Sequence, residues 1–424
     1  MFLLVLLGCF IVLLAIGLPI GIALGVTTAA VITWMTNINV ILVAQNSVAG
    51  LDSFPLLALP FFVLAGNLMF YGGISRRLLE LADVMVGKIT GGLGMVTTVA
   101  CMFFAAISGS GPATVSAIGT IIIPAMKEKK YDVNYAAAIT AAAGSIGVII
   151  PPSIPFVIYA VITGTSIADL FMAGIVPGII MGVSLMAVNY LMARKYGYKG
   201  RESDGAGKWT AFVDSLWALV MPVIILGGIY GGIFTPTEAA VVGCVYALFV
   251  GVFIYREIGL KEIYDALRDT GLITGATVFT LAFSTSFASL ITMKQVPNMV
   301  GSYLLSVSNS PIVIMMIINV FLLMVGCFVD NISACIILSP ILLPIVTKMG
   351  FDPIHFGVIM TVNLAIGFCT PPYGINLFVA AAVANTTVGK ISKFIGAFLI
   401  AMLITLLLTT YIPALSLFLP AFFK

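Results

Sequence analysis

Two short segments with proline pairs interrupt long apolar runs, and their atoms could bind a cation. Residues 144–153 read GSIGVIIPPS, and residues 367–373 read GFCTPPY. Proline lacks an amide donor and clashes with the carbonyl group one turn back, so a proline pair interrupts a helix. The carbonyl groups that are freed cannot face lipid and must be buried in protein or meet water or a ligand. Carbonyl and hydroxyl oxygens suit a hard cation such as Na⁺, so we expect a cation site at these breaks.

A second pair of segments has polar residues at the centre of apolar sequence. Residues 93–126 contain SGSGP at 108–112, and residues 311–347 contain FVDNIS at 328–333. Each half is about 15 residues long, which is short for a ~30 Å hydrocarbon core, so we predict two re-entrant helical hairpins. Half-helices that begin at the hairpin tips direct their positive ends toward the membrane midplane, which suits a carboxylate. Together, the breaks and tips predict a cation-coupled carrier for an anion.

Asp330 is the acidic residue in the apolar core of the second hairpin. A carboxylate inside the membrane is a candidate ligand by default, and here it would serve a cation site. The alternative role is a helix N-cap, because Asp330 precedes an apolar run and Asp is favoured at that position. Both roles are compatible at a hairpin tip. The tips and breaks contain no Lys or Arg. An anionic solute would therefore use helix ends, hydroxyls and amides, or a basic residue from elsewhere in the fold.

The composition identifies the elements that must position these segments. Hydrophobic residues make up 61% of the 424 positions, and mean hydropathy is +1.20. Only 8% of residues are charged, against about 25% in a typical soluble domain. These values exclude a water-soluble fold. The apolar runs are continuous and do not alternate with polar residues as β-barrel strands do, so we predict an all-α polytopic membrane protein.

The apolar runs predict about ten transmembrane helices besides the two hairpins. Their expected ranges are 2–16, 18–35, 54–72, 136–163, 170–193, 216–234, 238–255, 271–292, 353–384 and 393–418. The first is expected to be a retained span, because it lacks the charged start and cleavage site of a signal peptide. Residues 256–270 combine charges with apolar residues at helical spacing. They predict an amphipathic helix at the interface or, as the alternative, a plain linker.

The distribution of Lys and Arg predicts the orientation in the membrane. With an outside N-terminus, Lys294, Lys348 and Lys424 fall outside, and the other 16 of the 19 Lys and Arg residues fall inside. This asymmetry agrees with the positive-inside rule. We therefore expect both termini on the periplasmic side, the first hairpin on the cytoplasmic side and the second on the periplasmic side.

The chain also resembles itself at an offset of 220 residues. The matching features are Pro124 with Pro344, Asp132 with Asp352, Gly147 with Gly367, and Pro151-Pro152 with Pro371-Pro372. The interrupted segments coincide as well, and the two copies have opposite predicted orientations. This pattern predicts the inverted repeat of many secondary transporters, whose sites lie near the midplane where helices are broken. The alternative is a coincidence of Gly and Pro spacing among unrelated spans.

Cysteine and histidine give no sign of a metal cluster or a catalytic site. The six cysteines are dispersed in apolar runs without a CxxC motif, which is typical of buried thiols that pack as small apolar groups. His355 is the single histidine and Asp330 has no evident acidic partner, so we predict that the protein is not an enzyme. A channel would need a continuous pore with a repeated filter or charged rings, and two plugged hairpins argue against one. We expect no cofactor, Na⁺ as coupling ion and only metal, and no nucleic-acid partner.

Several long motifs resemble the large membrane subunit (M, DctM-like) of a tripartite ATP-independent periplasmic, or TRAP, transporter. They are LDSFPLLALPFFVLAGNLM from Leu51, SGSGPATVSAIGTIIIPAM from Ser108, GVIIPPSIPFVIYA from Gly147, GIFTPTEAAVVG from Gly232, DNIS from Asp330 and GFCTPPYGINLF from Gly367. Together they span essentially the whole chain. The resemblance implies an elevator-type ion-transporter fold in the bacterial inner membrane, driven by a Na⁺ gradient. The implied cargo is an organic acid such as a C4-dicarboxylate or sialic acid.

The resemblance also implies partners and ligand residues. The partners would be a small four-helix membrane subunit (Q, DctQ-like), not fused to this chain, and a periplasmic substrate-binding protein (P). A stand-alone cation-coupled carboxylate carrier is the alternative. The first sodium site would use Ser108, Ser110, Gly147, Ile150 and Pro152. The second, placed by the repeat, would use Asp330, Gly367, Thr370 and Pro372. The solute would lie between the tips, near Thr114, Ser153, Asn331, Ser333 and Asn376.

The implied elevator divides the chain into a scaffold and a mobile transport core. Residues 1–92 and 166–310 would be scaffold helices, the second group including the interfacial arm helix. Residues 93–165 and 311–388 would form the transport core, each with one hairpin and one broken helix. Residues 389–424 would add a C-terminal scaffold helix.

Overall fold

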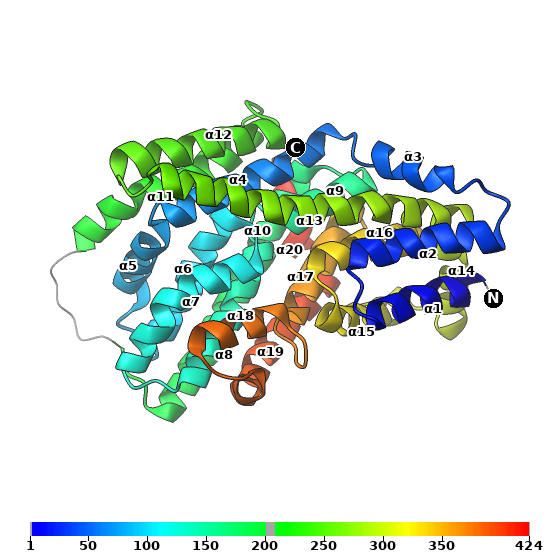
Figure 1. Cartoon of the computed structure of the whole chain (residues 1–424). Coiled ribbons are helices and arrows are strands. Elements are labelled where there is room, and N and C mark those ends of the chain that lie inside the picture. Colours follow the sequence, from blue (N-terminus) through cyan, green and yellow to red (C-terminus); the bar gives the residue numbers. More distant parts are fainter. Residues whose placement is uncertain (1, 201–207, 424) are drawn as a thin grey trace.

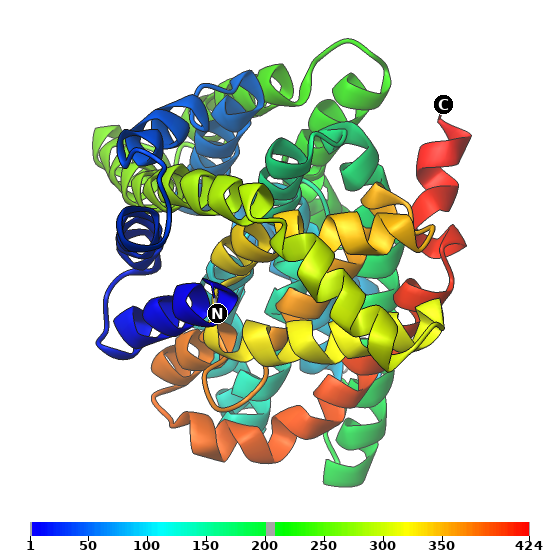
Figure 2. The same ribbon diagram turned by 90° about the vertical axis from the view of Figure 1, so that its right-hand side faces the viewer.

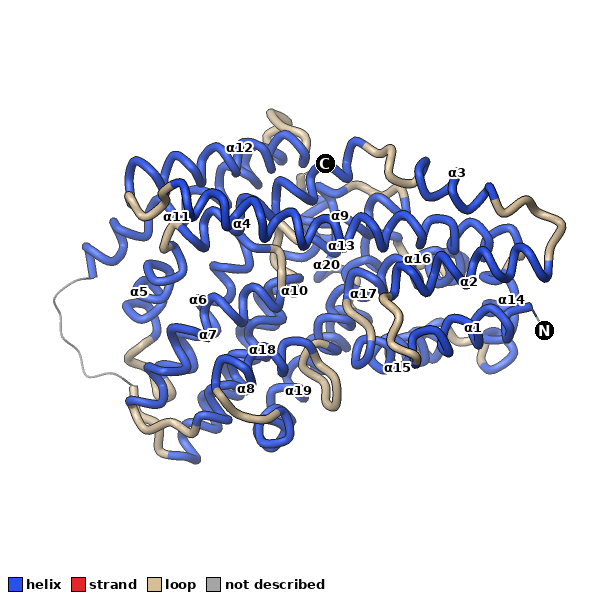
Figure 3. Tube along the Cα trace, in the orientation of Figure 1, coloured by secondary structure: helices blue, strands red, loops and turns tan. Residues whose placement is uncertain are grey.

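A computed structural model describes residues 2–200 and 208–423 of the chain. These residues form helices joined by short loops, and no strand occurs among them (Figure 3). In the described part, eight helical segments are long and apolar enough to cross a membrane, and shorter apolar helices accompany them. The predicted all-α polytopic membrane fold is therefore confirmed. Arg201 and Lys424, which the charge distribution included, lie outside the described residues.

The first half of the chain begins with helices that lead into the first hairpin and the first broken helix. Its helices are α1 Phe2–Ala15, α2 Ile20–Met35, α3 Ile41–Ala49, α4 Ala58–Tyr71, α5 Ile74–Val86, α6 Gly92–Ser108, α7 Gly111–Glu128, α8 Val133–Gly144, α9 Ile154–Thr163 and α10 Ile167–Tyr196. Short 3-10 turns occupy Phe54–Leu57 and Ser145–Val148. The hairpin consists of α6 and α7, and the broken helix consists of α8 and α9.

The second half follows the same order of elements. Its helices are α11 Lys208–Tyr230, α12 Pro236–Phe249, α13 Leu260–Met293, α14 Val296–Val307, α15 Pro311–Phe328, α16 Asn331–Lys348, α17 Pro353–Gly367, α18 Ile375–Ala384, α19 Val388–Tyr411 and α20 Ala414–Phe422. A π-helical turn, Val250–Ile254, extends α12. Here α15 and α16 form the hairpin, and α17 and α18 form the broken helix.

The boundaries of the helices confirm the internal repeat at 220 residues. Both ends of α16 lie 220 positions after the ends of α7, and α17 begins 220 positions after α8. The caps repeat too. Asp132 accepts hydrogen bonds from two backbone N–H groups at the start of α8, and Asp352 does the same at the start of α17. An aspartate N-cap satisfies amides that have no partner in the first turn of a helix, so the same residue begins the same element twice.

Both predicted hairpins form, but their arms are longer than expected. The arm α6 has 17 residues and α7, α15 and α16 have 18 each. The helix α7 continues through Pro124, and α16 continues through Pro340 and Pro344. Arms of this length could also cross a membrane, and α15 and α16 are among the eight candidate spans. Arm length alone therefore does not distinguish re-entrant hairpins from full crossings, and the side on which each hairpin enters stays a prediction.

One long helix replaces two predicted elements. The sequence predicts an interfacial helix over 256–270 and a separate span over 271–292, whereas α13 is a single helix of 34 residues. A glycine at the expected boundary, Gly271, costs a helix only about 1 kcal/mol. Packing of α13 along α4, α3 and α2 outweighs that cost. The short helices α3, α5 and α14 lie in stretches to which the sequence analysis assigns no helix.

The arrangement of the helices places the broken segments inside the molecule. In Figure 1, α13 runs across the upper part of the view, from α4 and α12 toward α2 and α3. Figure 2 shows the C-terminal helix α20 on the side opposite to the N-terminal helices. The helix α8 is enclosed by α6, α7, α18 and α19. Its six alanines, Ala136–Ala138 and Ala141–Ala143, are fully buried. Small side chains let helices approach closely, and α8 leads directly into the first break.

Candidate functional site

The tip of the first hairpin brings three predicted residues together. Gly109 ends α6 in the left-handed conformation, with φ +62°, which favours glycine. On either side of it, Ser108 and Ser110 are held by Thr114 one turn into α7. Ser108 Oγ lies 3.0 Å from Thr114 Oγ1, and Thr114 Oγ1 donates to Ser110 O at 2.7 Å. Two predicted sodium ligands therefore share one hydrogen-bonded turn with a predicted solute contact.

The first break packs directly on this tip. After α8, the turn Ser145–Val148 and the cis-linked pair Pro151-Pro152 carry the chain to α9. A methyl group on Gly147 would lie 2.6 Å from Ser110 O and 2.5 Å from Thr114 Oγ1. Only glycine allows so close an approach. Gly147 consequently lies against a hydroxyl oxygen of Thr114 and the carbonyl oxygen of Ser110.

The chain that leaves the break is also fastened to the tip. The Ile154 N–H donates to Gly109 O at 3.3 Å, and a methyl group on Gly109 would lie 2.7 Å from Pro152 O. Ser153 Oγ donates to Val148 O at 2.6 Å, so this predicted solute contact is used within the break. The predicted sodium ligands that meet at this contact are Ser108, Ser110, Gly147 and Pro152, and Ile150 belongs to the same loop.

At the second hairpin, Asp330 is the N-cap of α16. Its carboxylate accepts a hydrogen bond from the Ser333 N–H at 3.0 Å, so the predicted capping role is confirmed. Among the described residues, no hydrogen bond joins Asp330 to the second break. The next residue, Asn331, is 1% exposed, and neither atom of its amide has a partner in the described part of the chain. Buried amides are normally paired, so Asn331 has donor and acceptor capacity for a ligand.

The second break repeats the construction of the first. The helix α17 ends at Gly367, where a methyl group would lie 2.5 Å from the Cα of Gly326 on α15. Thr370 Oγ1 donates to Ile366 O at 2.9 Å, and the cis-linked pair Pro371-Pro372 leads to α18. Three predicted ligands, Gly367, Thr370 and Pro372, thus lie in one loop beside α15. The structure does not bond Asp330, the fourth, to any of them.

The two breaks touch at the centre of the fold. Ser145 Oγ lies 2.9 Å from Cys369 Sγ, and the Cys369 thiol donates to Ala141 O at 3.0 Å. Asn376 Nδ2 donates to Ala141 O and to Ser145 Oγ, both at 3.2 Å. Asn376 is predicted from the sequence as a site residue, whereas Ser145 and Cys369 are not. The repeat at 220 residues was the sequence signal that could have indicated this contact, because matching breaks meet near the twofold axis that relates the two repeats.

The five predicted solute contacts are all enclosed. Thr114, Ser153, Asn331, Ser333 and Asn376 have exposed fractions of 5% or less. Thr114 and Ser153 are hydrogen-bonded within the first repeat. In contrast, both side-chain amide atoms of Asn331 and the side-chain oxygen Oδ1 of Asn376 have no partner in the described residues. The structure does not gather these five side chains around one open pocket.

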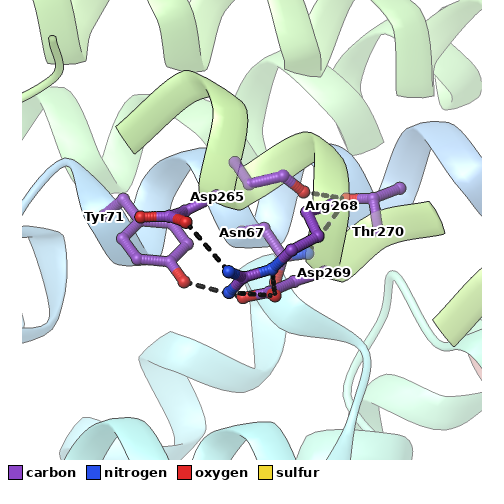
Figure 4. A network of polar contacts seen from close by, with 7 residues as sticks. Asn67, Tyr71, Asp265, Arg268, Asp269 and Thr270 are labelled. Carbon is purple, nitrogen blue, oxygen red and sulfur yellow. Dashed lines mark hydrogen bonds and ion pairs between the residues drawn. The ribbon is translucent and has the colours of Figure 1, made fainter. Parts of the chain in front are cut away.

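A cavity of about 300 Å³ lies instead beside the first hairpin, between α4, α6, α7 and α13. Aliphatic and aromatic side chains make most of its wall, and a few polar groups face it, which is typical of a small-molecule site. The polar residues are Asn67, Tyr71, Ser108, Ser110, Ser116 and Asp269. At its rim, the Tyr71 hydroxyl donates to Asp269 Oδ2 at 2.7 Å and Asn67 Nδ2 donates to Thr270 Oγ1 at 2.9 Å (Figure 4). Ser108 and Ser110 are predicted from the sequence as site residues, whereas Asn67, Tyr71 and Asp269 are not, because α4 and α13 are about 200 residues apart in the chain.

The oxygen atoms at the tips and breaks fit a hard cation by their chemistry. Hydroxyl and carbonyl oxygens are the ligands that such ions prefer. Within the described ranges, no group of three or more His, Cys, Asp or Glu side chains is placed to hold a metal ion. A cation at the tips and breaks would therefore be bound mainly by backbone and hydroxyl oxygens, with Asp330 as the acidic candidate at the second hairpin.

Comparisons with known proteins agree with these features. Residues 7–415 match the family described as tripartite ATP-independent periplasmic transporter, DctM component. The isethionate TRAP transporter permease protein DctMQ of Oleidesulfovibrio alaskensis is 48% identical over 416 residues, 98% of this chain and 66% of that protein. This chain thus spans about two thirds of that relative. The C4-dicarboxylate TRAP transporter large permease protein DctM of Rhodobacter capsulatus is 37% identical over 432 residues, 98% of each chain.

A solved structure shares the fold. The crystal structure of the YdaH transporter of Alcanivorax borkumensis superimposes with a TM-score of 0.61, covering 87% of this chain and 88% of that one. The sequence identity is 14%, so the likeness concerns the fold alone.

Proposed function

The chain belongs to the DctM component family of tripartite ATP-independent periplasmic (TRAP) transporters, and on this basis we propose that it imports an organic acid together with Na⁺. As a member of that family it is a large permease, and its apolar helices make it a multi-pass membrane protein. The bacterial inner membrane is the expected location. The observation that carries the proposal is the repeated contact between a hairpin and a break with a proline pair.

The first sodium site would lie where the first tip meets the first break. Ser108 and Ser110 contribute hydroxyl and carbonyl oxygens, and the close approach of Gly147 brings the break within reach of them. Carbonyl groups of the loop that contains Ile150 and Pro152 would complete the ligands. Such oxygens in an interrupted helix are the usual ligands of coupling ions in transporters.

The second sodium site would use the corresponding loop of the other repeat. Gly367, Thr370 and Pro372 supply its backbone and hydroxyl oxygens, and Asp330 is the acidic candidate at the tip of the second hairpin. The carboxylate is also the N-cap of α16, so it would serve the ion and the helix at the same time.

The solute would be an organic acid that binds between the two hairpin tips. The two relatives described above are named for isethionate and for C4-dicarboxylates, and both are small organic anions. The family resemblance adds sialic acid to the candidates. Thr114, Ser153, Asn331, Ser333 and Asn376 are the proposed contacts, and the unpartnered amide of Asn331 supports them most directly.

An elevator movement would carry the solute across the membrane. Residues 93–165 and 311–388 would move as the transport core against the remaining helices. A small membrane subunit (Q) and a periplasmic binding protein (P) would complete the transporter, with both termini of this chain in the periplasm. A stand-alone carrier is the alternative, and a transport assay that omits the binding protein separates the two.

Uptake into proteoliposomes tests the proposal. Vesicles would contain this chain, its small subunit and its binding protein, with labelled isethionate, succinate or sialic acid outside. We expect saturable uptake that requires an inward Na⁺ gradient and the binding protein. Uptake that is unchanged without Na⁺ would overturn the sodium sites and direct attention to proton coupling through Asp330. Uptake that does not saturate would indicate a channel.

A further inference from the structure

The cavity beside the first hairpin has one charged residue in its wall, Asp269. An acidic wall is unfavourable for an anionic solute unless a cation compensates it. Asp269 is compensated, because each of its carboxylate oxygens has a different partner. Tyr71 donates its hydroxyl to Oδ2 at 2.7 Å, and Arg268 donates Nε and Nη2 to Oδ1 at 3.1 and 3.0 Å.

Arg268 therefore contacts a residue of the cavity wall without being part of that wall itself. Figure 4 shows its guanidinium group between Asp265 and Asp269, with Tyr71 beside them. Its Nη1 lies 3.3 Å from Asp265 Oδ1. Among the described residues, Arg268 is the only Lys or Arg that bonds to a residue of the cavity wall. Its side chain is 52% exposed, so it is not fixed by packing.

We propose that Arg268 is the positive charge that binds the acidic group of the solute in this cavity, and that Asp269 holds its place until the solute arrives. The proposal rests on the proposed transport function, but it places the acidic group of the solute in the cavity beside the first hairpin, whose wall includes Ser108 and Ser110 of the first tip. It supplies the basic residue that the tips and breaks lack. A carboxylate or sulfonate in the cavity would replace Asp269 as the partner of the guanidinium, whose planar donors match such anions well. The number of ion pairs would stay the same.

Tyr71 makes this exchange feasible. Its hydroxyl binds the oxygen of Asp269 that Arg268 does not use, so Asp269 keeps a hydrogen bond after the guanidinium has turned away. The Asp269 side chain is 33% exposed, so its carboxylate is only partly desolvated and one retained hydrogen bond suffices to keep the cost of the exchange small. Asn67 and Ser116, which also line the cavity, provide polar groups for the rest of the solute.

Two variants with opposite expected effects test the proposal. Equilibrium binding of labelled isethionate, succinate and sialic acid would be measured on the transporter in nanodiscs at saturating Na⁺. In Arg268→Gln, the affinity for the bound acid should fall by about tenfold or more, the usual loss for a charged hydrogen bond. In Asp269→Asn, it should rise by up to about fivefold, because the competitor for Arg268 has lost its charge. Arg268→Lys should be intermediate.

Arg76→Gln is the matched control. Arg76 is also an exposed arginine in an ion pair, with Glu257 at 3.1 Å, but it does not line the cavity or bond to its wall. We expect unchanged affinity in this variant. Melting temperatures near that of the wild type would show that each variant is folded.

The outcomes distinguish failure of the role of Arg268 from failure of the proposed transport function. If the wild type binds and transports an acid but Arg268→Gln binds it equally well, the role of Arg268 is excluded and the transport function stands. If Arg268→Gln and Asp269→Asn both weaken binding, the pair has a structural role and the exchange is excluded. If the wild type binds and transports none of the acids, the proposed function itself fails.

Discussion

The hydroxyl oxygen of Ser145 lies 2.9 Å from the sulfur of Cys369, a contact between residues 224 positions apart that joins the two broken helices. Asn376 donates to the same hydroxyl, and Ala141 O accepts from both the thiol and the amide. All four groups are buried, so their hydrogen bonds have no substitute from water. The contact ties the break of one repeat to the break of the other.

We expect Cys369→Ala to destabilise the protein by about 1 kcal/mol, because Ser145 loses a partner inside the fold. The measurement is thermal unfolding of the purified protein in detergent. Cys369→Ser is the matched control, since a hydroxyl can donate to Ala141 O and accept from Ser145. A melting temperature for Cys369→Ala equal to that of the wild type would show that this contact contributes nothing.

Gly147→Ala should weaken the binding of Na⁺ at the first site and so raise the Na⁺ concentration that uptake requires. The added methyl group would lie 2.5 Å from Thr114 Oγ1 and 2.6 Å from Ser110 O, so the break or the tip must move apart. We expect the Na⁺ concentration for half-maximal uptake to rise about tenfold, the loss of one charged contact.

Gly389→Ala is the control for that variant, because no described atom beyond its chain neighbours and the adjacent backbone of α19 lies within 4 Å of the methyl group it adds. It should transport like the wild type. An unchanged Na⁺ requirement in Gly147→Ala would remove the support for the first sodium site.

Variants of Asp330 separate its two possible roles. Asn is as good an N-cap as Asp, so Asp330→Asn should keep the stability of α16 while it removes the charge. Asp330→Ala should lose both and cost about 1 kcal/mol of stability. If Asp330 is a sodium ligand, Asp330→Asn alone will raise the Na⁺ concentration needed for uptake. Normal Na⁺ dependence in that variant would leave Asp330 with the capping role only.

The elevator hypothesis predicts that a link across the cavity stops transport. Ala113 of α7 and Ile273 of α13 both line the cavity, on opposite sides of the proposed sliding surface. In a cysteine-free background, Ala113→Cys combined with Ile273→Cys should be inactivated by a bifunctional thiol reagent that is cleaved by reduction. Reduction should restore uptake, and each single variant should be insensitive. Full activity of the linked protein would contradict a movement between these helices.

The sequence predicts the fold where local chemistry decides it. Proline pairs mark the breaks, and the aspartates at 132 and 352 begin α8 and α17. It does not predict α5 and α14, which lie about 220 residues apart, near the offset of the repeat, but are too short to give a membrane signal. It also predicts a break in α13 at Gly271, because the sequence changes there from charged to apolar. The packing that keeps the helix continuous cannot be seen in that change.

The candidate site is predictable only in part for a related reason. The contact of Gly147 with Ser110 follows from matching motifs, whereas Tyr71, Arg268 and Asp269 meet only because α4 and α13 pack together. Their spacing of about 200 residues carries no signal in a single sequence. Asp330 shows a different limit, since one residue type suits both a cap and an ion ligand.

The continuity of α13 makes the thickness of the surrounding lipid relevant to transport. A helix of 34 residues is about 51 Å long, whereas the hydrocarbon core of a bilayer measures about 30 Å. Such a helix must tilt or extend beyond the acyl chains, and a thinner or thicker bilayer changes its inclination. Because Asp269 and Ile273 of α13 form one wall of the cavity, a change in lipid chain length would alter that wall without any change in sequence.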